Sequence, residues 1–150
     1  MFAGCHWHSH PQVPQGEARH NLRQFFVAEQ VYFADHDTYT SSVEALAPLF
    51  QPERGNRFTY FLGGPSLVDR SCSTEPGLHG ATGFDADVFR GFAHSVPDVS
   101  NLRIDGPDAG GFSVSPFGAV QPGPGGSFVI VASANLDADD EVETWAIANL

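Results

Sequence analysis

Oxygen ligands are concentrated in one turn near the carboxyl terminus. Asn135, Asp137, Asp139 and Asp140 follow an apolar run and precede a further acidic residue, Glu141. Carboxylate and amide oxygens are the ligands that hard cations prefer, so these residues form a candidate Ca²⁺ site. The turn lacks the glycine of an EF-hand loop, and a solvated acidic turn explains the same pattern. Calcium is thus the candidate cofactor here, beside the interpretation of a plain charged connection.

A second group of metal-ligating side chains lies at the amino terminus. Cys5, His6, His8 and His10 offer the thiolate and imidazole ligands that Zn²⁺ and copper prefer. The residues around them show no helical or strand periodicity. The interpretation we favour is therefore an unstructured tail in which any metal binding is adventitious.

Residue patterns typical of catalysis are not found. The sequence has no nucleophile elbow, no pair of carboxylates on an apolar frame, and no phosphate-binding glycine loop between a strand and a helix. His79 and His94 stand alone. We therefore expect no catalytic residues and a protein that is not an enzyme.

Composition limits the classes of protein further. The chain of 150 residues is 41% hydrophobic, has a formal net charge of −11 and contains no lysine. Those figures predict one domain with a single core, and they argue against nucleic-acid binding, which needs clustered cations. No run approaches the ~18 apolar residues of a membrane span, and no secretory leader is evident. As written, the chain carries no export signal.

The elements that must position these residues follow a helix-then-strands order. Apolar residues at helical spacing predict a long helix over 17–34, and a Ser-capped short helix is predicted near 43–46. Strands are predicted over 57–62, over 112–120 with a break at Pro116, and over 127–134 and 142–147, the last two as an antiparallel hairpin. A weak helix is predicted near 85–92. The fold class is therefore α+β.

Several segments are specific enough to indicate a family. They are Glu17–Arg23, Ala28–Ala34, Thr38–Thr40, Pro52–Tyr60, and the closing stretches Ala134–Asp139 and Glu143–Ile147. In this order they resemble type IV pilins of the delta-proteobacterial kind, over roughly residues 16–149. The resemblance implies an amino-terminal helix packed on a four-stranded antiparallel sheet. Residues 16–150 are then the pilin-like globular domain.

The resemblance also implies a function. A type IV pilin is a structural subunit of a pilus used for adhesion, twitching motility or DNA uptake, on the cell surface or in the extracellular pilus. Its partners are other pilin subunits and the pilus assembly machinery, and it meets the membrane only through an apolar amino-terminal helix. A pseudopilin of a type II secretion system, or a stand-alone pilin-like head that binds a short helical pilin, are the alternatives.

The large apolar residues of the helix and strands have two interpretations within this family. They form the core between helix and sheet, or they pack against neighbouring subunits of a filament. The residues concerned are Leu22, Phe25, Phe26, Tyr32, Phe33, Tyr60 and Trp145.

Residues 1–15 depart from the family, because a leader and an apolar helix are expected there. One choice of synonymous codons for residues 3–15, read one base later, encodes an isoleucine- and alanine-rich segment similar to the pilin helix. We therefore expect residues 1–15 to be a disordered or out-of-frame segment, produced by a frameshift or a sequencing error. The DNA sequence upstream of Gly16 tests this hypothesis.

Overall fold

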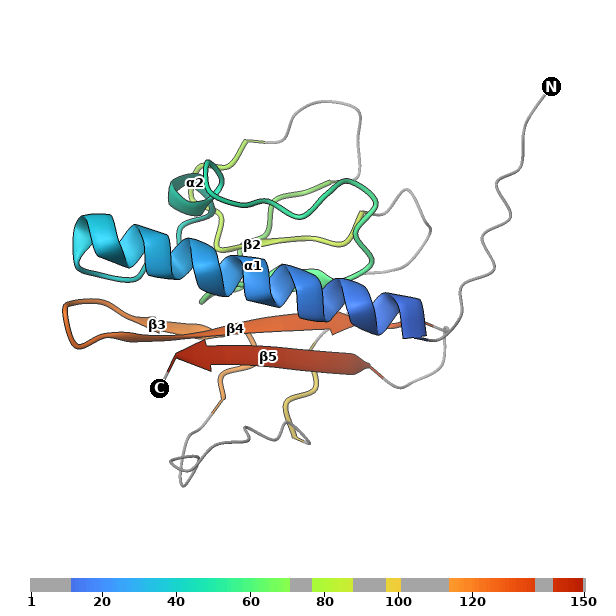
Figure 1. Ribbon diagram of the computed structural model, residues 1–150. Coiled ribbons are helices and arrows are strands. Elements are labelled where there is room, and N and C mark those ends of the chain that lie inside the picture. The colour runs from blue at the N-terminus through green and yellow to red at the C-terminus, as the bar shows by residue number, and fades with distance from the viewer. Residues whose placement is uncertain (1–11, 71–76, 88–96, 101–113, 137–141, 150) are drawn as a thin grey trace.

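The computed structural model describes residues 12–70, 77–87, 97–100, 114–136 and 142–149. One long helix, α1, lies along an antiparallel sheet, and the segment after the helix covers the remaining core (Figure 1). The predicted α+β class, with an amino-terminal helix on an antiparallel sheet, is confirmed.

Helix α1 spans Gln12–His36. Its inward side carries Ala18, Leu22, Phe25 and Ala28, which are spaced three or four residues apart and are all buried. The helix ends where Asp37 takes a left-handed backbone conformation, with φ of 54°, and its N–H donates to the Phe33 carbonyl. The helix begins five residues earlier and ends two residues later than predicted. The two added residues at its end, Asp35 and His36, are exposed.

The short second helix, α2, spans Val43–Leu46 as predicted. The Ser42 side chain accepts a hydrogen bond from the Ala45 N–H at 3.3 Å, which satisfies one of the free donors at the helix start. Val43 and Leu46 are fully buried, so this turn fastens the segment after α1 to the core.

The sheet has five strands, all paired antiparallel. They are β1 (Thr59–Phe61), β2 (Gly83–Phe84), β3 (Ala119–Gln121), β4 (Ser127–Ala134) and β5 (Glu143–Asn149). One edge of β4 pairs with β5 along seven residue pairs, which confirms the predicted hairpin. The other edge pairs with β3 near the start of β4 and with β1 near its end.

The number of strands corrects the prediction of four. Because β1 and β3 share one edge of β4, the sheet is only four strands wide, in the order β2-β1-β4-β5. The additional strand is β2, whose two residues are too few to show a periodicity in the sequence. The helix predicted at 85–92 does not begin where expected, because residues 85–87 have no regular secondary structure. Residues 88–92 lie outside the described part.

The strand predicted over 112–120 is also shorter than expected. Residues 114–118 form a turn, in which the Gly118 N–H donates to the Ser115 carbonyl, and β3 begins only at Ala119. Proline has no N–H to donate to a sheet, which explains why pairing starts after Pro116.

The core has two unequal parts on the two faces of the sheet. The main cluster lies between α1 and the sheet and contains Phe25, whose ring centroid lies 5.5 Å from that of Tyr60 and 6.0 Å from that of Phe84. A smaller cluster on the opposite face contains Phe61, Val129 and Val131. Neighbouring strand residues point to opposite faces, so β1 and β4 contribute to both clusters.

Candidate functional site

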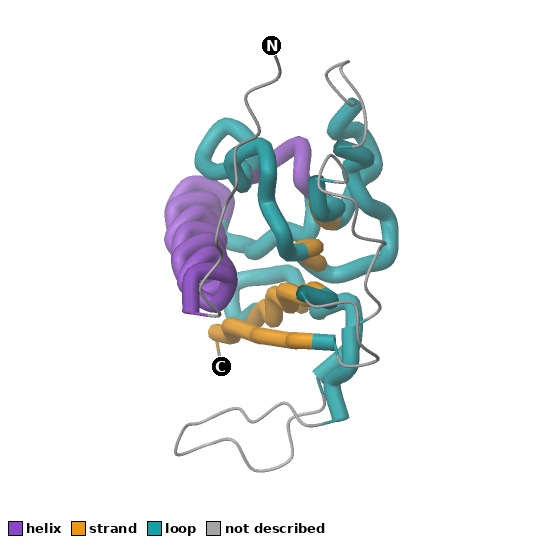
Figure 2. The backbone as a smooth tube through the Cα atoms, turned by 90° about the vertical axis from the view of Figure 1, so that its right-hand side faces the viewer, coloured by secondary structure: helices purple, strands orange, loops and turns teal. Residues whose placement is uncertain are grey.

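The side of α1 that faces away from the sheet is exposed. We call it the outward face, and it consists of exposed residues at helical spacing: His20, Arg23, Val27, Gln30 with its neighbour Val31, and Ala34. Figure 2 shows this side of the helix turned away from the strands and loops. Val27 is 54% exposed and Val31 is 41% exposed, although both are branched apolar residues. Adjacent exposed apolar side chains on one helix face are a candidate contact surface for another protein.

The large residues predicted as core or filament contacts lie in the main core cluster or against it. Leu22, Phe25 and Tyr60 are buried in the main cluster. Phe26, Tyr32, Phe33 and Trp145 are half-buried and pack against that cluster. The structure therefore gives these residues packing partners within the chain, and the outward face consists of residues that the sequence did not single out.

A hydrogen-bond cluster ties α1 to the start of β1. The Glu17 Oε1 atom accepts hydrogen bonds from the Arg57 N–H at 2.8 Å, from the Phe58 N–H at 3.3 Å and from the Tyr60 hydroxyl at 3.4 Å. Asn21 Nδ2 donates to the Tyr60 oxygen at 2.9 Å. Burial raises the pKa of the Glu17 carboxyl, and the two backbone N–H groups oppose that rise.

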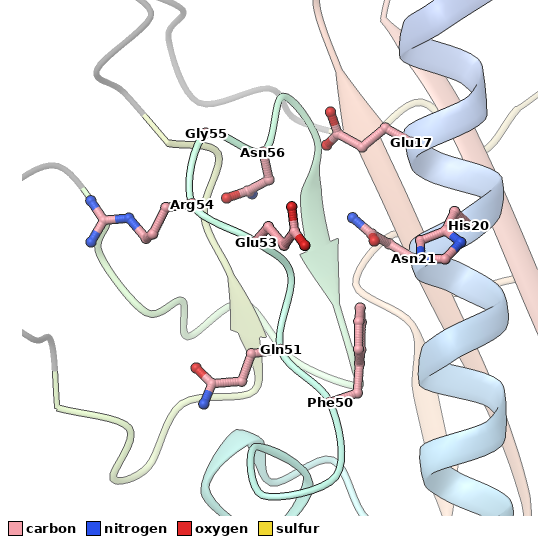
Figure 3. Close-up of a pocket in the computed structure, with 9 residues that line it drawn as sticks. All are labelled: Glu17, His20, Asn21, Phe50, Gln51, Glu53, Arg54, Gly55 and Asn56. Atoms are coloured by element: carbon pink, nitrogen blue, oxygen red, sulfur yellow. The ribbon is translucent and has the colours of Figure 1, made fainter.

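A pocket of about 370 Å³ opens beside this cluster, between α1 and the segment that follows α2. Figure 3 shows Glu17 and Asn21 on the helix side and Glu53 and Asn56 on the loop side, and Phe50 forms part of the wall. The Phe50 ring stacks edge-on against Phe25 with centroids 4.8 Å apart. The pocket is thus built on core residues.

Charged residues behind the pocket hold the loop at 52–57 against the end of β2. Arg54 Nε lies 3.0 Å from Asp87 Oδ2, which also accepts from the Gly55 N–H. Arg70 is 4% exposed and donates to the Pro52 carbonyl, the Glu53 carbonyl and Asn56 Oδ1. We call these groups the arginine clasp: Arg54, Asn56, Arg70 and Asp87. The sequence gives no signal for it, because its members are separated by turns and loops.

A single buried acid lies on the inward side of α1. Glu29 is 0% exposed, its Oε2 atom accepts a hydrogen bond from the Thr40 N–H at 3.2 Å, and its Oε1 atom has no partner among the described residues. Burial raises the pKa of Glu29 to about 7. The helical spacing of the sequence could have found it, since Glu29 follows Leu22 and Phe25 on the same side.

The candidate metal ligands are only partly within the described residues. Asn135 is half-buried just after β4, and the other three predicted calcium ligands, Asp137, Asp139 and Asp140, lie outside the described part. The amino-terminal Cys5, His6, His8 and His10 lie outside it as well. Among the described residues, no group of three or more Asp, Glu, His or Cys side chains is arranged to hold a metal ion.

A long helix along an antiparallel sheet, with one helix side left free, defines the pilin-like class of α+β folds. The family described as Type IV pilin PilA matches residues 11–144, so the chain belongs to the type IV pilin family. The Type IV major pilin protein PilA of Myxococcus xanthus (strain DK1622) is 25% identical over 142 residues. That alignment covers 89% of this chain and 64% of the relative. Within the described residues, no helix has both the length and the apolar character to cross a membrane.

Proposed function

We propose that the chain is a structural subunit of a type IV pilus, placed in an extracellular filament with other pilin subunits. The observation that supports this function most directly is the outward face of α1, where Val27 and Val31 are exposed although the opposite side of the helix is fully packed. Family membership supplies the kind of partner, because a type IV pilin assembles with copies of itself. The role is structural, and assembly takes the place of catalysis.

Contact through the outward face is tested by charge substitution in cells. We expect Val27→Asp and Val31→Asp to abolish or strongly reduce surface filaments, because a carboxylate in an apolar contact loses its solvation. Leu49→Asp is the matched control, since Leu49 is 45% exposed but lies outside α1. Filaments are counted by electron microscopy, and circular dichroism of the purified variants shows whether each still folds.

Filament counts of the three variants distinguish an assembly role of α1 from its absence. Loss of filaments in the α1 variants with normal filaments in the Leu49 variant supports the assembly role. Normal filaments in all three variants would contradict it. Twitching and DNA uptake, measured on the same strains, then assign the pilus activity that the subunit serves.

A further inference from the structure

Several hydrogen-bond acceptors in the pocket beside α1 have no partner among the described residues. All the hydrogen bonds that the Glu17 carboxylate accepts from the described residues go to Oε1, so Oε2 accepts none from them. The Glu53 carboxylate makes no hydrogen bond or ion pair within the described part of the chain. Both residues line the pocket, and Figure 3 shows their side chains directed into the space between helix and loop.

A buried amide adds a third acceptor, independently of the acidic residues. Asn21 is 8% exposed and lines the same pocket. Because the Tyr60 hydroxyl gives its proton to Glu17, the Asn21 group that faces Tyr60 is the Nδ2 donor. Asn21 Oδ1 is therefore left without a partner among the described residues, next to the Glu17 carboxylate. Asn21 Oδ1 is not one of the buried atoms that lack a partner, so it is open to the pocket, where a ligand with N–H donors can bind it.

The positive charge near the pocket is already engaged elsewhere. Arg54 lines the pocket, but its Nε binds Asp87 and its side chain donates to the Arg70 carbonyl. In Figure 3 the Arg54 side chain points away from Glu17 and Asn21. The Arg57 side chain acts on Glu17 as a nearby charge, beside the hydrogen bond from its backbone N–H, and Arg57 does not line the pocket. The pocket thus has two carboxylates and an amide oxygen facing it, with the Phe50 ring as an apolar wall.

These groups match a guanidinium. Its five N–H donors lie in one plane, bind carboxylates in pairs, and stack against aromatic rings. The chain has no lysine, so arginine is the permanently charged side chain that a second copy can offer. Among the described arginines, Arg19 lies over Trp145, Arg54 binds Asp87, Arg70 is buried, and Arg57 is half-buried near Glu17 of its own chain. Arg90 and Arg103 lie outside the described residues. Arg23 is exposed on the outward face and makes no hydrogen bond, ion pair or ring contact within the described residues.

We propose that this pocket receives the Arg23 side chain of a second copy of the chain. The proposal rests on the proposed function, because it supplies one of the contacts that join subunits. Arg23 and the pocket are different surfaces, so the contact is heterologous and repeats from copy to copy in an open assembly. It also gives a chain of net charge −11 an attractive charge contact between like-charged subunits.

The test is a solution titration that needs no filament. The full chain, labelled with ¹⁵N and kept reduced, is titrated with unlabelled chain at pH 8, where an ordinary histidine is neutral and an ordinary carboxyl is ionised. We expect the Asn21 side-chain amide and the Gly55 backbone amide to shift, and salt to weaken the effect. Arg23→Gln and Glu53→Gln should each raise the apparent Kd about fivefold or more. Glu44→Gln, which removes the same charge at an exposed site that does not line the pocket, should leave the Kd unchanged.

Mixing the two variants identifies the occupant. Labelled Arg23→Gln chain keeps its pocket, and unlabelled Glu53→Gln chain keeps its Arg23. Their mixture should restore the shifts at Asn21 and Gly55, whereas labelled Arg23→Gln chain with more of the same variant should show none. If shifts persist in every variant, or are absent in the wild-type chain at millimolar concentration, the proposal is wrong. Either result leaves the pilus function itself untouched, because the Val27 and Val31 variants test that separately.

Discussion

Single residues of α1 have different tasks according to the side on which they lie. Glu17 and Asn21 hydrogen-bond to β1, and Phe25 fills the core, whereas Val27 and Val31 are left to solvent. Glu29 is the exception, because it is an acid on the apolar side. A buried carboxyl with one hydrogen bond and no cation beside it is more stable in its protonated form. Its ionisation is therefore linked to folding.

The buried carboxyl of Glu29 leads to the first prediction, for the variant Glu29→Gln. The pKa of Glu29 is raised from 4.5 to about 7 in the folded chain, so the folded state binds the proton more tightly than the unfolded state. Protonated Glu29 therefore contributes roughly 3 kcal/mol to the free energy of unfolding. This contribution is fully present below pH ~4.5 and is lost as the pH rises through about 7. Glutamine keeps an acceptor for the Thr40 N–H but cannot ionise. We expect the variant to be more stable than the wild-type chain at pH 8 and similar to it at pH 5.

Urea unfolding at several pH values measures this difference. Glu44→Gln is the control, because Glu44 is exposed and pairs only with His79 at the surface. The same pH dependence in the wild-type chain and in Glu29→Gln would show that other groups, such as Glu17, are responsible.

At the scale of elements, short strands are held by contacts that local sequence does not encode. Strand β2 has two residues, and its position depends on pairing with β1 and on the arginine clasp at its end. The joint between β1 and β3 depends on Gly118. That residue has φ of 72°, and a Cβ there would lie 2.4 Å from the Val129 carbonyl oxygen.

Replacing Arg70 tests the clasp. We expect Arg70→Ala to lower the free energy of unfolding by about 3 kcal/mol, because the Pro52 and Glu53 carbonyls lose a buried donor. Arg54→Ala should cost less than about 1 kcal/mol, since the Arg54 side chain is 55% exposed. Chemical denaturation measures the free energy of unfolding of the two variants. Equal losses of stability would show that the buried hydrogen bonds of Arg70 contribute no more than the exposed Arg54 contact.

Replacing Gly118 tests the joint between strands. Gly118→Ala combines an unfavourable left-handed backbone with a clash against the neighbouring strand, so we expect a loss of about 2 kcal/mol or more. Gly125→Ala is the matched control, because a Cβ at Gly125 meets nothing within 4 Å. The melting temperatures of the two variants are compared, and similar melting temperatures would contradict the role given to Gly118.

The long elements were predictable from sequence and the short ones were not. Helix α1, the Ser42-capped turn and the β4–β5 hairpin each carry a periodicity or a capping residue within their own segment. Strand β2 and the Glu17 and Arg70 contacts join residues far apart in the chain. The pocket was missed for the same reason. The outward face could have been found by extending the helical spacing to its exposed side.

At the scale of the whole molecule, we propose that one helix serves both folding and assembly. Its inward side packs on the sheet, and its outward face is turned away from the strands and loops (Figure 2). The adjacent pocket is the second surface that we propose for contact with another subunit. Because folding does not use the outward face, substitutions there should alter assembly and leave the stability of the monomer nearly unchanged.

The most direct measurement of the pilus role is mass spectrometry of filaments sheared from the producing cells. Trypsin cleaves after arginine, so a peptide spanning Gln24–Arg54 identifies this chain. We expect that peptide in filaments of the wild-type strain and its loss, together with the filaments, when the gene is deleted. Filaments that lack the peptide and remain unchanged in the deletion strain would contradict the account.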